Sequence, residues 1–80
     1  MKNKKVLVTG ATGFLGKSLV SNLLNCGADV IGTGYSESNI KKFERTFGNK
    51  VKIYSVDIAS NYVALKNILL QEKVDYVIHA

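Results

Sequence analysis

Cysteine, long apolar runs and clusters of metal-binding side chains are all scarce in this sequence. Its one cysteine, Cys26, excludes an internal disulfide and agrees with a reducing compartment. No stretch approaches the ~20 apolar residues of a membrane span, and the apolar run after the basic residues 2–5 stops at Thr9, too early for a signal peptide. No group of His, Cys and carboxylate residues has metal-ligand spacing. We therefore expect a cytoplasmic protein without a membrane segment or a metal site.

The composition is that of a globular chain. Hydrophobic residues make up 46% and charged residues 21%, which distinguishes the chain from a disordered tail. No repeat, linker or low-complexity segment interrupts it. A chain of 80 residues allows one small domain at most, and it buries only a little over ~60% of its unfolded surface, so its stability should be modest.

The net charge of +5 raises the question of a nucleic-acid partner. The lysines are dispersed, however, and no aromatic and basic stripe of an RNA-binding sheet is present. Ordinary solvated lysines explain the charge better, so we expect no nucleic-acid partner. A nucleic-acid-binding fragment remains an alternative that salt-dependent binding to DNA or RNA would reveal.

The rest of the chain depends on the stretch 6–16, where an apolar run breaks into three glycines. Residues 6–8 are aliphatic with no polar face, which suits a parallel strand buried on both sides. Gly10, Gly13 and Gly16 follow at intervals of three and lead into a helical pattern. Glycine permits a tight turn and close backbone approach. The amides and dipole of the helix that follows favour an anion, so the stretch predicts a phosphate site.

The spacing of the glycines decides between two kinds of phosphate-binding turn. A nucleoside-triphosphate P-loop needs Gly, four residues and then Gly-Lys-Ser/Thr. Residues 16–18 read Gly-Lys-Ser, but the residue five before Gly16 is Ala11, so this match fails by one position. Gly10, Gly13 and Gly16 instead follow the dinucleotide fingerprint G-x-G-x-x-G with its first gap one residue wider.

Alternating patterns along the chain predict four strands and three helices. The expected strands are 6–8, 29–33, 51–56 and 74–78. The first helix should run from Phe14 and stop at Gly27, with Cys26 on its apolar face as a small hydrophobe. Ser36 or Ser38 should cap the second helix, which 48–49 ends, and Ser60 should cap a third helix that runs through Glu72.

Strands that alternate with helices indicate an α/β fold built from right-handed βαβ units around a parallel sheet. The doubly wound, Rossmann-type order 3-2-1-4 would place a crevice between the first and fourth strands, above the glycine turn. The fourth strand would be left as an apolar, unpaired edge. We therefore expect residues 1–80 to be the first half of an NAD(P)-binding domain, a fragment without the substrate-binding part.

Residues 9–16 read T-G-A-T-G-F-L-G and resemble the T-G-x-x-G-F-x-G signature of the extended short-chain dehydrogenase/reductases. This family comprises nucleotide-sugar epimerases, dehydratases and reductases, and the resemblance extends in order over the whole chain. It implies that the turn contacts NAD(P) through six residues: Gly10, Thr12, Gly13, Phe14, Leu15 and Gly16.

The same resemblance assigns roles at the ends of the third and fourth strands. Asp57 and Ile58 match the pair that lies beside the adenine, where the carboxylate accepts from the exocyclic amine and the next amide faces the ring; a simple turn role is the alternative. Ala80 would begin the contact with the nicotinamide-side ribose. His79 is better explained as a hydrogen-bonded scaffold residue than as a ligand or base.

No acidic residue ends the second expected strand, where dinucleotide sites often use Asp or Glu to accept the ribose hydroxyls. The position reads Gly34, followed by Tyr35 and Ser36, which we assign to the cofactor with a plain turn role as the alternative. Without a carboxylate nothing repels the 2′-phosphate of NADP, so NADP is slightly favoured over NAD, and Gly34→Asp should strengthen NAD. The polar or basic side chains expected near that phosphate are Ser36, Lys41, Lys42 and Arg45.

Tyr62 and Lys66 match the Tyr-x-x-x-Lys pair of short-chain dehydrogenases, but we expect no catalytic residue in this chain. In the resembling family that pair follows the fifth strand, whereas Tyr62 and Lys66 lie on the crossover between the third and fourth strands. That helix should pack on a sheet face, away from the crevice.

The resemblance implies the cofactor-binding part of an enzyme that exchanges hydride with a nicotinamide, assisted by a Tyr and a Lys beyond residue 80. The substrate would be a nucleotide-sugar or a similar carbonyl or alcohol compound, and the full-length protein could form a homodimer. A non-catalytic NAD(P)-sensing regulatory module is the alternative. A Ser/Thr and a Tyr-x-x-x-Lys downstream would indicate the enzyme.

Overall fold

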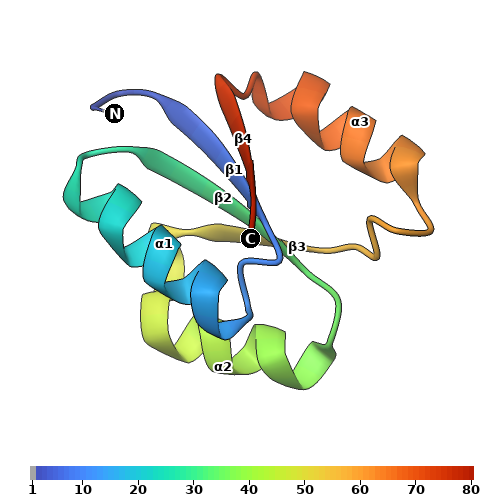
Figure 1. Ribbon diagram of the computed structural model, residues 1–80, viewed down its shortest axis with the longest axis horizontal. Coiled ribbons are helices and arrows are strands. Elements are labelled where there is room, and N and C mark those ends of the chain that lie inside the picture. The colour runs from blue at the N-terminus through green and yellow to red at the C-terminus, as the bar shows by residue number, and fades with distance from the viewer. Residues whose placement is uncertain (1) are drawn as a thin grey trace.

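Strands and helices alternate along residues 2–80, the part of the chain that the computed structural model describes. The elements in chain order are β1 (Lys5–Thr9), α1 (Phe14–Asn25), β2 (Asp29–Gly34), α2 (Glu37–Phe47), a 3-10 turn (Gly48–Lys50), β3 (Lys52–Ser55), α3 (Tyr62–Glu72) and β4 (Tyr76–His79). Figure 1 shows the strands as one sheet between two layers of helix.

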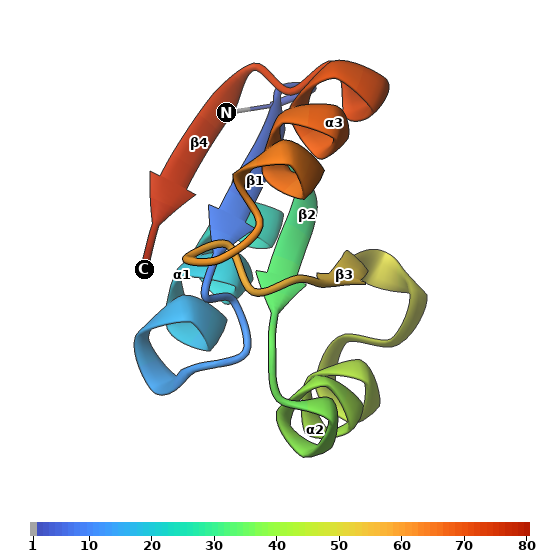
Figure 2. The same ribbon diagram turned by 90° about the vertical axis from the view of Figure 1, so that its right-hand side faces the viewer.

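All four strands are parallel and lie in the order β3-β2-β1-β4, which confirms the predicted topology. In the centre, Leu7 of β1 lies beside Ile31 of β2 and Val77 of β4. Because the strands are parallel, their carboxyl ends meet at one edge of the sheet. Figure 2 shows β1 and β4 pointing the same way, and the backbone of Ala80 donates to the carbonyl of Thr9 at 3.0 Å.

Helices α1 and α2 cover one face of the sheet. Val6, Val8 and Val30 point to this face and are at most 1% exposed. They pack in one cluster with Val20 of α1 and with Phe43 of α2. The three-and-four spacing of the apolar residues on both helices explains why these faces turn inward.

Helix α3 covers the opposite face, over the side chains of Leu7 and Ile31. Ile68 is the buried residue of α3, whereas Val63 on the same helix is 65% exposed. Figure 1 shows α3 alone on its side of the sheet, with α1 and α2 on the other side. One helix therefore covers this face, whereas two cover the other.

Glu72 at the end of α3 connects this helix to two strands. Its Oε2 accepts from Lys52 Nζ at 2.8 Å and from the hydroxyl of Tyr54, and its Oε1 lies 3.3 Å from Lys5 Nζ. The hydrogen bond from Lys52, followed by that from Tyr54, lowers the pKa of Glu72 to about 2. The same hydrogen bond to Glu72 raises the pKa of Lys52 above its ordinary range. These contacts lie at the amino ends of β1 and β3, away from the glycine turn.

Local side-chain hydrogen bonds decide where two of the helices begin. Ser36 caps α2, because its hydroxyl accepts from the amide of Asn39 at 3.4 Å. Asn61 caps α3, so the expected cap at Ser60 is wrong; the Asn61 side chain accepts from the amide of Ala64 at 3.1 Å. Asn is as good an N-cap as Ser, and the chain reaches capping geometry one residue later than expected.

Three further sequence-based expectations differ from the structure in detail. Cys26 is exposed and caps the carboxyl end of α1, because the helix ends at Asn25 before the apolar face reaches it. β3 is shorter than 51–56, and β4 begins at Tyr76, two residues later than expected. Val74 instead packs against the α3 side of the core.

None of the three α-helices within residues 2–80 combines the length and apolar character that crossing a membrane requires.

Candidate functional site

The glycine turn follows β1 and lies against the end of β2. Gly10 has a φ of +69°, which glycine adopts without strain. The amide of Ala11 donates to the carbonyl of Thr33 at 2.9 Å, and the amide of Gly13 donates to the carbonyl of Gly10 at 3.2 Å. These bonds fix the turn beside β2 and set the direction in which α1 begins.

Gly13 and Gly16 differ in what surrounds them. A Cβ on Gly16 would collide with the carbonyl oxygen of Gly10 and lie 2.8 Å from the Cα of Ala11, so Gly16 lets α1 pack against the turn. A Cβ on Gly13 would have its nearest neighbour, again the Gly10 oxygen, at 3.6 Å. The space beside Gly13 is therefore left open by the protein itself.

In the described part of the chain, no side chain caps the amino end of α1, in contrast to α2 and α3. Gly13 is the N-cap residue of α1 and makes no side-chain hydrogen bond, whereas Ser36 and Asn61 cap the other two helices. The first-turn amides of a helix need a partner from a side chain, water or a ligand. An anion such as a phosphate satisfies these amides and is also favoured by the helix dipole.

A hollow of about 400 Å³ lies at the carboxyl ends of the strands. Its lining includes most of the candidate residues from the sequence: Gly10, Thr12, Gly13, Tyr35, Ser36, Asp57, Ile58 and Ala80. It also includes residues that we had not assigned to the cofactor: Thr9, Thr33, Gly34, Asn39 and Val56. Among residues 2–80, Asp57 is the one charged residue in this lining, so a bound phosphate would meet amides and hydroxyls rather than a basic side chain.

The remaining three candidates of the turn do not line this hollow. Phe14 is 93% exposed, and Leu15 lines a smaller neighbouring hollow that also touches Ala80. Gly16 is buried beneath the turn. Phe14 and Leu15 therefore flank the hollow, and Gly16 lies beneath it.

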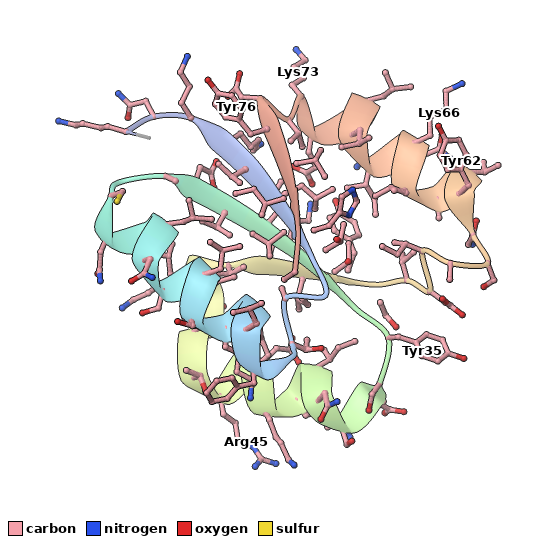
Figure 3. All side chains as sticks on the ribbon, viewed as in Figure 1. Tyr35, Arg45, Tyr62, Lys66, Lys73 and Tyr76 are labelled. Carbon is pink, nitrogen blue, oxygen red and sulfur yellow. The ribbon has the colours of Figure 1, made fainter. Side chains whose placement is uncertain are left out.

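The end of β2 presents hydroxyl and amide groups to the hollow. Ser36 lines it while capping α2, and Tyr35 beside it is 72% exposed. Lys41 does not line the hollow and lies 3.5 Å from Glu37. Figure 3 shows Arg45 projecting from the far side of α2, away from Tyr35. Of the side chains suggested for a 2′-phosphate, Ser36 is the one that lines the hollow.

Asp57 lies in the loop after β3, and one of its carboxylate oxygens is hydrogen-bonded within that loop. Its Oδ1 accepts from the amide of Ala59 at 3.2 Å, which is the turn role considered from the sequence. Its other carboxylate oxygen makes no hydrogen bond among the described residues. The amide of Val56 donates to the carbonyl of Gly34 at 2.9 Å and brings Asp57 beside the end of β2.

The carboxyl end of β4 closes the other side of the hollow. His79 Nδ1 lies 2.7 Å from the hydroxyl of Thr9, which is 2% exposed. This contact agrees with a scaffold role for His79. Ala80 follows directly, and its carbonyl oxygen would lie 3.1 Å from a Cβ on Gly10.

Tyr62 and Lys66 lie on α3, outside the hollow. Tyr62 is 73% exposed, and Lys66 is exposed as well. Figure 3 shows both side chains on the outer part of α3, separated from Tyr35 at the end of β2. The structure thus places this pair on the crossover helix, as the sequence predicts, and neither residue lines the hollow.

Apart from Asn39, the lining residues that the sequence analysis does not assign to the cofactor lie at strand ends. Thr9 ends β1, Thr33 comes one residue before the end of β2, and Val56 follows β3. In an open parallel sheet, ligands bind outside the carboxyl ends of the strands, so strand-end position was a usable signal. Asn39 gave no such signal, because it lies within the first turn of α2.

The curated proteins that this chain resembles in sequence are UDP-glucose 4-epimerases. The chain is 36% identical over 80 residues to a UDP-glucose 4-epimerase of Neisseria meningitidis serogroup B, covering 95% of this chain and 23% of that protein. The chain therefore spans about a quarter of the length of the curated relatives it matches.

Solved structures agree with the fold. The structure of Pen from Bacillus thuringiensis superposes with a TM-score of 0.83 at 30% identity, covering 99% of this chain and 25% of that chain. Yeast methylglyoxal/isovaleraldehyde reductase Gre2, solved with NADPH, gives a TM-score of 0.73 at 25% identity, covering 94% of this chain and 26% of that chain. The profile of the NAD dependent epimerase/dehydratase family matches residues 6–80, and the chain belongs to this family.

Proposed function

We propose that residues 1–80 bind the pyrophosphate and adenosine of NAD(P) in the hollow at the strand ends. The uncapped amino end of α1 carries this proposal. Its first amides have no side-chain partner, and the turn leaves open space beside its N-cap residue, Gly13. A pyrophosphate would supply the missing partner of these amides. Asp57 and Ile58 line the same hollow and would hold the adenine, with Ala80 beside the ribose on the nicotinamide side.

We propose NADP rather than NAD as the preferred cofactor. The end of β2 offers Gly34, Tyr35 and Ser36 to the hollow, and none of these accepts both ribose hydroxyls as a carboxylate would. Ser36 can donate its hydroxyl to a 2′-phosphate. The proposed preference for NADP rests on the lack of a carboxylate at the end of β2 that would repel the 2′-phosphate.

We propose that the protein containing this chain is an epimerase, dehydratase or reductase acting on a nucleotide-sugar or a similar carbonyl or alcohol substrate. The bound nicotinamide would supply hydride exchange with the substrate. Similarity to UDP-glucose 4-epimerases supports a uridine diphosphate sugar as the first substrate to test. The acid and base of the reaction would come from outside residues 1–80, because the one Tyr-x-x-x-Lys pair lies on α3.

Titration of NAD and NADP into the intact protein tests the cofactor site. We expect saturable binding of both dinucleotides and a lower Kd for NADP. Incubation of the holoenzyme with UDP-glucose and UDP-galactose then tests the reaction. Dinucleotide binding without turnover of any nucleotide-sugar, ketone or aldehyde would favour the regulatory alternative. If the protein binds neither NAD nor NADP, the proposed site is refuted.

A further inference from the structure

Strand β3 carries one side of the hollow although it lies at the edge of the sheet. Between residues 2 and 80, β2 is the one strand that pairs with β3. Val56, Asp57 and Ile58 follow β3 directly and line the hollow. Because an edge strand makes backbone hydrogen bonds to a strand on one side only, the place of these lining residues depends on what else holds β3.

Glu72, at the end of α3, holds two of the four residues of β3. Lys52 and Tyr54 are two apart and so share one face of the strand, and Tyr54 packs in the same cluster as Ile68 of α3. Both side chains donate to one atom, Glu72 Oε2, with Lys52 Nζ at 2.8 Å. Lys52 Nζ also lies 5.1 Å from the centre of the Tyr54 ring. Glu72, Lys52 and Tyr54 therefore form one connected group that links the edge strand to α3.

The other carboxylate oxygen of Glu72 reaches the central strand β1. Glu72 Oε1 accepts from Lys5 Nζ at 3.3 Å. The Glu72 side chain is 11% exposed, and a carboxylate with so little water around it needs hydrogen-bond donors and opposite charge. The two ammonium groups and the Tyr54 hydroxyl supply both. One residue thus joins α3, the edge strand and the strand that leads into the glycine turn.

The loop between β3 and α3 is fixed at both of its ends. The amide of Val56 donates to the carbonyl of Gly34 at 2.9 Å, which holds the start of the loop against β2. The carbonyl of Asp57 accepts from the amide of Asn61, the N-cap residue of α3, also at 2.9 Å. Figure 1 shows this loop running from the end of β3 to the start of α3. A shift of β3 relative to α3 would therefore move Asp57.

We propose that Glu72 is a positioning residue for the adenine part of the cofactor. It does not line the hollow, and it acts by holding β3 against α3, which fixes the place of Asp57 and Ile58 between them. This inference rests on the proposed dinucleotide function, and it extends that function to a residue at the amino ends of the strands.

Amide hydrogen exchange in the intact protein tests this positioning without any ligand. In Glu72→Ala, the amide of Val56 should exchange about tenfold faster than in the parent, because local opening of β3 no longer breaks the contacts of Glu72. The amide of Ala11, which donates to Thr33, should change less. Unchanged exchange at Val56 would overturn the proposal.

Ile68→Val is the matched control for a general loss of stability. It removes one methylene from the buried face of α3 and leaves Glu72 with its three partners. The exchange of Val56 should stay close to that of the parent. If Ile68→Val and Glu72→Ala accelerate Val56 equally, Glu72 is a general stabilising residue and the proposal fails.

Dissociation constants for ADP and nicotinamide mononucleotide test the consequence for the cofactor. Glu72→Ala should weaken ADP by about fivefold or more and leave nicotinamide mononucleotide unchanged. Glu72→Gln keeps an oxygen that can accept from Lys52 and Tyr54, so it should recover most of the affinity for ADP. Lys5→Met removes the link to β1 but not the link to β3, and it should leave ADP binding unchanged.

Two results for the ligands would count against the proposal or its basis. Equal weakening of ADP and nicotinamide mononucleotide by Glu72→Ala would overturn the proposed positioning of the adenine side. If the parent binds neither ADP nor a dinucleotide, the proposed function fails, and the positioning of an adenine by Glu72 fails with it. The exchange of Val56 would then still decide whether Glu72 holds β3 against α3.

Discussion

The Nδ1 of His79 and the hydroxyl of Thr9 lie 2.7 Å apart and join the carboxyl ends of β4 and β1 beside the hollow. Thr9 is buried, so its hydroxyl has few other partners. The backbone bond from Ala80 to Thr9 runs alongside at 3.0 Å. The pair thus holds the last residues of β4 in register with the strand that leads into the glycine turn.

His79→Ala should lower the free energy of unfolding by about 1 kcal/mol, because it leaves the buried Thr9 hydroxyl without its partner. His79→Asn is the matched variant, since its side-chain oxygen can take the place of Nδ1, and it should recover most of the loss. Urea unfolding of the intact protein measures both. Equal stability of the parent and His79→Ala would show that the contact contributes nothing.

Gly13→Val should weaken dinucleotide binding by ~10-fold or more, because the branched side chain occupies the space where the pyrophosphate approaches the backbone. The fold should survive, since a Cβ at this position has no neighbour closer than 3.6 Å. Gly16→Val is the contrasting control and should destabilise the fold itself, because its Cβ collides with the turn. Calorimetric titration and thermal unfolding separate the two effects; undiminished binding by Gly13→Val contradicts the phosphate site.

Asp57→Asn should reduce dinucleotide affinity by ~10- to 100-fold, the value of a hydrogen bond to a charged group. The amide oxygen of Asn can still accept from Ala59, so the loop should keep its shape, but the acceptor proposed for the adenine amine is lost. Binding of ADP should weaken to the same extent. Binding of nicotinamide mononucleotide, which has no adenine, should stay unchanged; a loss there would mean that the loop had moved.

Protonation of Glu72 at low pH should lower the free energy of unfolding. The pKa of Glu72 is lowered to about 2 in the folded protein, chiefly by the hydrogen bond from Lys52, against ~4.3 for an unperturbed Glu. Its contribution is therefore fully present above about pH 4.3 and is lost as the pH falls from there toward 2. Glu72→Gln should be less stable than the parent at pH 7, and the gap should narrow below pH 4. If the difference in stability between the parent and Glu72→Gln stays constant from pH 7 to 2.5, the lowered pKa of Glu72 is contradicted.

Tyr62→Phe should leave turnover of the intact enzyme nearly unchanged. Tyr62 is 73% exposed on α3 and does not line the hollow. Lys66→Gln on the same helix serves as a second test with the same expectation. A loss of ~100-fold or more in kcat, the scale of general acid-base catalysis, would place the active site on α3 and contradict the proposed site.

The amino-acid sequence by itself determined the strand order and indicated the sheet edge at which we propose the site. Apolar runs and helical spacing alternate clearly, and right-handed crossovers leave few ways to arrange four such strands. The glycines after residues 6–8 identified the edge of the sheet at which a ligand would lie. The strands and helices follow from neighbours within a few residues, and the general rule for crossovers then supplies their order in the sheet.

Only the tertiary structure decided what the individual residues of the site do. The sequence treats Gly13 and Gly16 alike, but only the packing of α1 on the turn shows that Gly16 is needed for the fold while Gly13 leaves open space. Similarly, the contact of Thr12 with position 34 depends on how the turn lies against β2. Residues far apart in the chain meet only once strand register and helix packing are fixed, and no periodicity along the sequence encodes which atoms then touch.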